Sequence, residues 1–243
     1  MVVDKKFYER LKLFWWVFLG MNVYNFLESF LVKIAYKVLN DYQERGIEPS
    51  ESKVRFVAFL AENNRILAYI GLAVYLIYFV TMLRLRKYSD GLLITAFLGI
   101  FVTVLSIIHT FFFWNKNAND PKVLILTYAV ILGSLALSVL FAVSMLKLVK
   151  PYSEDITMLW KIYLWVVIAD YVLRIIHAVL ISVAAPRGEG MEKVLTAVNM
   201  IQTIYGYIIV PFEILCMALT VLMFKKKMQD DNNIEAGDLK WQN

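Results

Sequence analysis

The chain has 243 residues, of which 60% are apolar and 19% are charged, whereas a typical soluble domain has roughly 45–50% apolar and about 25% charged residues. Its mean hydropathy is +0.62, its apolar residues form long runs, and its single cysteine, Cys216, forbids an intrachain disulfide. These values exclude a soluble globule, a disordered chain and a disulfide scaffold. The net charge of +5 comes from basic residues that lie mostly beside apolar runs, where they act as topology signals rather than as a nucleic-acid surface.

Six segments are apolar over the roughly 20 residues that a membrane-spanning helix needs. We therefore predict an all-α integral membrane protein, built as a six-helix transmembrane bundle that occupies residues 1–224 as one domain. A polar cytoplasmic tail is expected at 225–243. The helices are expected at about 13–36, 66–83, 92–114, 123–148, 159–185 and 194–224.

The connections between these segments carry turn and capping residues. Most loops are short, which makes consecutive helices antiparallel neighbours, but residues 37–65 form one longer, partly helical loop. Within it, Gly46 and Pro49 interrupt any helix, and Ser50 is suited to cap a helix that begins near Glu51. Similar signals stand at Ser89–Gly91, Asp120–Pro121 and Ser153.

The distribution of Lys and Arg predicts the orientation in the membrane, because cytoplasmic loops are enriched in these residues. If the N-terminus is inside, segments 1–12, 84–91, 147–161 and 225–243 are inside and hold 14 of them. The outside loops, 37–65, 115–122 and 186–193, then hold nine. We expect both termini in the cytoplasm.

Three ionisable residues lie in the fifth segment at membrane depth, where each costs on the order of 2.5–3.5 kcal/mol to insert. Asp170, Arg174 and His177 fall on one face of a helix at ~100° per residue. Asp170 and Arg174 are spaced i, i+4 and can form an ion pair that joins this helix to a neighbour. The same face can instead serve as a proton or ion relay, or bind a solute, and both readings stay open.

The sixth segment carries Asn199, Gln202 and Glu213 on one face. Pro211 removes a backbone hydrogen bond close to Glu213, which predicts a kink or break in the helix. Carboxylates beside broken helices build ion and substrate sites in transporters. The alternative is a packing kink with Glu213 paired to Arg174.

Glu28, in the first segment, is a third acid at membrane depth. Three acids then compete for the single arginine at that depth, Arg174. At least one must be protonated or face water, because desolvation disfavours the charged form of a carboxyl group. We predict a polar, proton-linked core formed by the first, fifth and sixth helices.

Small residues and histidines suggest additional roles. Gly99, Ser134 and Ser138 are expected at helix-packing positions, because small side chains let membrane helices approach closely. His109 and His177 lie on separate helices at similar depth, which makes a haem between them a weaker alternative. No cofactor and no metal site are predicted.

Known catalytic motifs are absent: there is no P-loop, no G-x-G-x-x-G, no G-x-S-x-G and no His-Glu-x-x-His. The sequence therefore favours a non-enzymatic membrane protein, a small transporter or channel for an ion or solute. The first alternative is a sensor or scaffold subunit that acts through a homo-oligomer or a membrane partner subunit. The second is an intramembrane enzyme or haem-binding protein.

Overall fold

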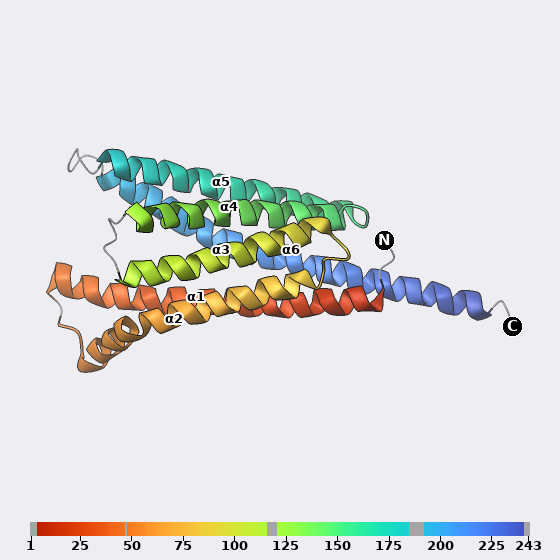
Figure 1. Cartoon of the computed structure of the whole chain (residues 1–243), viewed down its shortest axis with the longest axis horizontal. Helices are drawn as coiled ribbons and strands as arrows, with labels where there is room; N and C mark the ends of the chain where they lie inside the picture. The colour runs from red at the N-terminus through yellow and green to blue at the C-terminus, as the bar shows by residue number, and fades with distance from the viewer. Residues whose placement is uncertain (1–3, 47, 116–120, 185–191, 241–243) are drawn as a thin grey trace.

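The computed structural model describes residues 4–46, 48–115, 121–184 and 192–240, and in these ranges every element is an α-helix. The helices are α1 (Lys5–Arg45), α2 (Glu51–Leu83), α3 (Asp90–Asn115), α4 (Pro121–Val149), α5 (Glu154–Ala184) and α6 (Glu192–Lys240). They lie roughly side by side, with both termini at the same end of the bundle (Figure 1). Each helix contains a stretch long and apolar enough to cross a membrane, in agreement with the predicted architecture.

The main helix contacts form a closed ring. Each helix packs against the next one along the chain, and α6 returns to pack against α1. In such a ring every helix turns one face to a common centre. Polar side chains placed on those inner faces can meet without touching lipid.

The first helix is longer than the predicted segment 13–36. It begins at Lys5, where the side chain of Asp4 accepts a hydrogen bond of 2.6 Å from the Phe7 backbone N–H. It ends at Arg45, and Gly46 follows in the left-handed region at φ 62°. Glycine adopts this conformation without the steric cost that a Cβ brings.

The connection between the first two helices is mostly helical rather than a long loop. Because α1 continues to Arg45 and α2 begins at Glu51, most of the segment 37–65 is helical. The predicted N-cap position of Ser50 is correct, but its side chain makes no capping hydrogen bond. Its Oγ atom lies 3.1 Å from the Oγ atom of Ser52 instead.

The sixth helix is continuous through Pro211, so the chain is not broken there. Proline has no N–H, and the Tyr207 carbonyl therefore lacks its usual helical donor. The expected tail also differs, because the helix runs on to Lys240. An ion pair of 2.9 Å between Lys227 and Asp231, spaced i, i+4, supports this extension.

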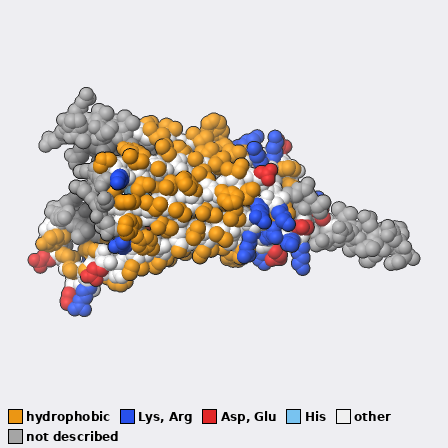
Figure 2. All heavy atoms as spheres, viewed as in Figure 1, with side chains coloured by type: hydrophobic (Ala, Val, Ile, Leu, Met, Phe, Trp, Pro, Cys, Tyr) orange, Lys and Arg blue, Asp and Glu red, His pale blue; other side chains and the backbone are white. Residues whose placement is uncertain are grey.

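Basic residues gather at the end of the bundle that holds both termini (Figure 2). We call this the basic end, and it comprises Lys5, Lys6, Arg10, Lys12, Arg84, Arg86, Lys87, Lys147, Lys150 and Lys225–Lys227. The largest fully buried side chains lie mostly in the half of the bundle next to it, among them Phe7, Leu11, Phe14, Phe18, Met82, Leu85, Leu92, Met145, Trp160, Met217 and Phe224. Beyond Asn22, no described side chain of α1 is buried. The tight core is therefore confined to one half of the membrane span.

Aromatic rings close the basic end. The buried ring of Phe7 lies 4.6 Å from that of Tyr88 and 4.9 Å from that of Phe224 between centroids. Tyr152 adds a contact with Phe224 at 5.1 Å. The Arg10 side chain donates a 2.9 Å hydrogen bond to the Arg84 carbonyl. These contacts join the start of α1, the α2–α3 and α4–α5 connections and α6 at Phe224.

Gly99 sets the distance between α2 and α3. A Cβ atom at this position would lie 2.3 Å from the ring atoms of Phe79, which is far inside van der Waals contact. Gly99 is itself buried. The absent side chain is what lets the Phe79 ring occupy this space, as expected for small residues between membrane helices.

We expect Gly99→Ala to lower the free energy of unfolding by about 1–3 kcal/mol, because overpacking forces neighbouring side chains and backbone to shift. Gly20→Ala is the matched control, since nothing lies within 4 Å of its added Cβ. The measurement is thermal unfolding of the purified protein in detergent. Equal unfolding temperatures for the two variants would contradict the close packing of Gly99 on Phe79.

Candidate functional site

A polar cavity of about 360 Å³ lies inside the ring, and all six helices contribute to its walls. Its polar lining residues are Asn22 and Asn25 on α1, Tyr75 and Tyr78 on α2, Thr95 on α3, Ser138 on α4, Tyr163, Asp170 and Tyr171 on α5, and Glu213 on α6. Two of the predicted site residues, Asp170 on α5 and Glu213 on α6, therefore line the same cavity. This central cavity is the candidate functional site.

Glu213 contributes a carboxylate with little charge compensation. The Tyr163 hydroxyl on α5 donates a hydrogen bond to it. Among the side chains that the structure describes, no Lys, Arg or His forms an ion pair with Glu213. A negative charge here must be balanced by a proton, by water or by a bound cation.

Asp170 lies in the same cavity and is only 5% exposed. Its neighbour one turn further along α5 is Arg174, at the i, i+4 spacing that favours an ion pair. The side chains of Arg174 and His177 lie outside the described ones, so the predicted Asp170–Arg174 pair stays a prediction. The same holds for the side chains of Asn199 and Gln202 on α6.

The two asparagines of α1 are held by hydrogen bonds. Asn22 donates to the Phe18 carbonyl at 3.0 Å, within its own helix. Asn25 donates to the Tyr75 hydroxyl on α2 at 2.8 Å. Asn25 thereby joins α1 to α2 at the wall of the cavity.

Sequence reasoning placed Tyr163 on the polar face of the fifth helix but missed Tyr75 and Tyr78 on α2 and Tyr171 on α5. Tyr75, Tyr78 and Tyr171 line the cavity, and the Tyr171 hydroxyl lies 3.4 Å from the Oγ atom of Ser138 on α4. A signal was present, because tyrosines of membrane helices are usually enriched near the two interfaces. These three lie inside the apolar stretches instead.

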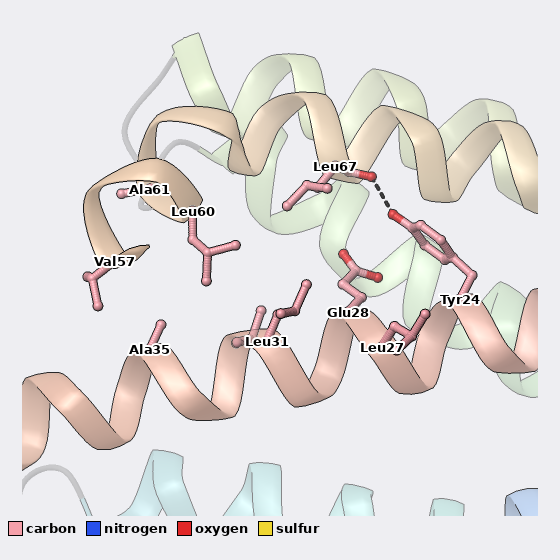
Figure 3. Close-up of a pocket in the computed structure, with 10 residues that line it drawn as sticks. Tyr24, Leu27, Glu28, Leu31, Ala35, Val57, Leu60, Ala61 and Leu67 are labelled. Carbon is pink, nitrogen blue, oxygen red and sulfur yellow. Dashed lines mark hydrogen bonds between the residues drawn. The ribbon is translucent and has the colours of Figure 1, made fainter. Parts of the chain in front are cut away.

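Glu28 does not line the central cavity. It lies at a separate pocket of about 420 Å³ between α1 and α2, among mostly apolar side chains (Figure 3). On one side of this pocket the Tyr24 hydroxyl donates a 2.6 Å hydrogen bond to the Leu67 carbonyl. Tyr75 lines the central cavity and lies within electrostatic range of both Glu28 and Glu213. The structure therefore divides the predicted acidic cluster into two places.

The predicted packing position Ser138 and the histidine His109 form hydrogen bonds within and between helices. Ser138 donates a 3.1 Å hydrogen bond to the Ser134 carbonyl on the same helix. The Nε2 atom of His109 lies 2.9 Å from the Thr127 hydroxyl, which joins α3 to α4. Within the described part of the chain, no group of three His, Cys, Asp or Glu side chains is placed to hold a metal ion.

An aromatic layer lies next to the cavity on the side of the basic end. It consists of Phe14, Phe18, Tyr78, Phe141 and Trp160. The Phe14 and Tyr78 rings are 5.1 Å apart, and those of Phe141 and Trp160 are 5.8 Å apart. Tyr78 and Phe141 line the cavity itself, whereas Phe14 and Phe18 on α1 and Trp160 on α5 are fully buried between the lining positions of their helices and the basic end.

The aromatic layer is attached to α6 by one buried hydrogen bond. The indole N–H of Trp160 donates to the Thr220 hydroxyl at 3.0 Å, and both residues are fully buried. Thr220 in turn donates to the Cys216 carbonyl within α6 at 2.7 Å. The Thr220 hydroxyl thus satisfies the only polar atom of the indole ring.

No family model, curated protein or solved structure matches this chain. The site must therefore be interpreted from its own residues. Its defining features are the two carboxylates, the tyrosines and amides around them, and the aromatic layer on the side of the basic end.

We expect Thr220→Val to lower the free energy of unfolding by about 1–3 kcal/mol, because the Trp160 N–H loses its partner while it stays buried. Thr103→Val is the matched control, since its buried hydroxyl bonds only to the Gly99 carbonyl of its own helix. Thermal unfolding in detergent provides the comparison. If both variants lost the same stability, the Trp160–Thr220 bond would contribute nothing specific.

Proposed function

We propose that this chain is a small multi-pass membrane transporter that carries a small solute through the central cavity in exchange with protons. The observation that carries the proposal is the pair of carboxylates, Asp170 and Glu213, in a polar cavity at the centre of six candidate membrane spans. Ionisable groups at this depth are expensive to insert, and in membrane proteins they mark substrate and ion pathways.

Glu213 is the residue best placed to take up and release a proton. Its described contacts are a hydrogen bond from Tyr163 and a cavity wall, with no ion pair to a described basic side chain. The negative charge of a carboxylate in this position can be neutralised alternately by a proton and by a positively charged solute. Asp170 sits beside the position of Arg174, and its role is to shape the polar wall.

The aromatic layer favours a carrier over an open channel. A conducting channel needs a continuous path, whereas the fully buried rings of Phe14, Phe18 and Trp160 occupy the interior of the bundle on the basic-end side of the cavity. Carriers expose a central site to one side of the membrane at a time, by moving helices against one another. In this proposal the aromatic layer is the gate that opens in the other state.

The orientation follows from the basic end. Lys and Arg gather on the cytoplasmic side of membrane proteins, so we propose that both termini lie in the cytoplasm (Figure 2). The closed gate then faces the cytoplasm. The ring is completed by α1 packing on α6 within one chain, so a homo-oligomer or partner subunit is not needed to form the cavity.

The alternative is a sensor or scaffold subunit. Its support comes from the helical extensions, because α1 continues to Arg45, α2 begins at Glu51 and α6 continues to Lys240, all beyond the candidate spans. Such extensions offer surfaces to a partner protein. This alternative predicts no solute movement by the purified chain.

Flux through proteoliposomes separates the two proposals. Vesicles that hold the purified chain and a pH-sensitive dye are exposed to outward or inward gradients of cationic, anionic and neutral solutes. We expect a gradient of one class to drive proton movement, and Glu213→Gln to reduce this movement at least tenfold, because an amide cannot release a proton. Glu28→Gln, a matched change outside the central cavity, is expected to alter it less than twofold.

Two outcomes would contradict this proposal. Absence of proton or solute movement by the wild type under every gradient and voltage would favour the sensor or scaffold. Unchanged movement with Glu213→Gln would remove Glu213 from the mechanism. Circular dichroism and size-exclusion chromatography show whether each variant is folded.

Cysteine labelling tests the gate and the orientation together. In a Cys216→Ala background, we expect Asn25→Cys in the cavity to react with a membrane-impermeant thiol reagent added outside intact cells. Phe14→Cys, in the aromatic layer, should stay unmodified from that side. Lys87→Cys, exposed at the basic end, should react only after permeabilisation. Labelling of Lys87→Cys in intact cells would reverse the orientation.

A further inference from the structure

The lining of the central cavity is acidic and lacks described positive charge. Its charged residues are Asp170 and Glu213, and among the described lining side chains there is no Lys, Arg or His. An anionic solute would meet a like charge in this space, which is unfavourable. A cation would meet the carboxylate of Glu213, which no described basic side chain pairs.

Aromatic rings surround the same carboxylate. Tyr75, Tyr78, Tyr163, Tyr171 and Phe141 all line the cavity. Aromatic faces attract organic cations through their quadrupole, and this attraction strengthens as the site excludes water. Carboxylates combined with several rings select an organic cation over a small inorganic ion, because the rings replace part of the hydration that an inorganic ion would lose.

The size of the cavity fits a small organic molecule. Its volume of about 360 Å³ equals that of roughly a dozen water molecules at ~30 Å³ each. Sites for small ligands are typically about 300–1,000 Å³. A metal ion or a proton alone would leave most of this space to water, whereas a single-ring or two-ring cation would fill it.

We infer that the central cavity binds a small organic cation, an amine or a pyridinium with an apolar body, with its charge on Glu213 and its body against the tyrosines. This inference rests on the proposal that the cavity is the solute site of a carrier. Binding then exchanges one charge for another: the cation joins ionised Glu213, and the proton that neutralised Glu213 leaves to water. The total charge of the site is the same in both states, which makes the exchange of one cation for one proton possible.

The described groups that share the cavity with Glu213 come from five other helices. Tyr75 and Tyr78 on α2 and Tyr163 on α5 lie within its electrostatic range, as does Cys216 on its own helix. Asp170 and Tyr171 on α5 also line the cavity. From α1, α3 and α4 the polar lining side chains are Asn22, Asn25, Thr95 and Ser138, which carry no charge. Asp170 and Glu213 are therefore the acidic groups among the described lining side chains.

The test uses two probes of nearly equal shape and different charge. 1-Methyl-4-phenylpyridinium is a permanent cation, and 4-phenylpyridine is its neutral counterpart at pH 7.5. Binding to the full chain in detergent is measured by equilibrium dialysis. We expect the cation to bind at least tenfold more tightly than the neutral compound. We expect Glu213→Gln to lower the affinity for the cation at least tenfold. Glu28→Gln should leave the affinity within twofold.

A second measurement on the wild type does not depend on any variant. In weakly buffered solution, binding of the cation should release protons, and its affinity should fall as the pH is lowered, because protons compete for Glu213. The neutral compound should release none. This measurement decides the question if Glu213→Gln fails to fold.

The outcomes separate this inference from the proposed function. Equal affinity for the two probes would overturn the inference. So would binding of the cation that releases no protons and is unchanged by Glu213→Gln. Proton-linked movement of an anionic or neutral solute in vesicles, without cation binding, would overturn it while the carrier stands. Cation binding that depends on Glu213 in a chain that moves no solute would support the cation site and overturn the carrier.

Discussion

A hydrocarbon layer offers no hydrogen-bond partners, and this constraint decides the arrangement of the whole chain. Backbone groups must be satisfied within each spanning segment, which leaves helices as the available structure for this sequence. Polar side chains within the spans must then face protein or water. The ring of α1 to α6, closed by α1 against α6, provides one interior for them. The carboxylates of Asp170 and Glu213 and the amide of Asn25 all lie there.

Packing is uneven along the helix axes, and this unevenness positions the cavity. Next to the basic end, large side chains such as Phe14 and Trp160 are fully buried and fill the ring. Further along the helices the interior is lined by tyrosines and amides and keeps open space. The close approach of Gly99 and Phe79 holds α2 and α3 together beside the cavity. The cavity therefore forms next to a densely packed part of the interior, without a break in α6 at Pro211.

The two acidic places in the structure differ in their surroundings. Glu213 lies with a tyrosine donor in the interior of the ring, whereas Glu28 lies in a mostly apolar pocket between α1 and α2 (Figure 3). Tyr75 lies close to both and is fixed by Asn25.

The number of helices, the start of α2 near Glu51 and the position of the acids within apolar segments could be predicted from the sequence, because apolar length, capping residues and charge placement are local properties of a chain. The sequence could not determine which of these acids share a cavity, and it placed Glu28 with Glu213 although the structure separates them. Lipid-facing and inward-facing apolar surfaces have the same composition, so rotation of each helix cannot be deduced from hydrophobicity. Only the tertiary packing, where one helix meets the side chains of its neighbours, turned Tyr75 and Tyr171 toward the centre.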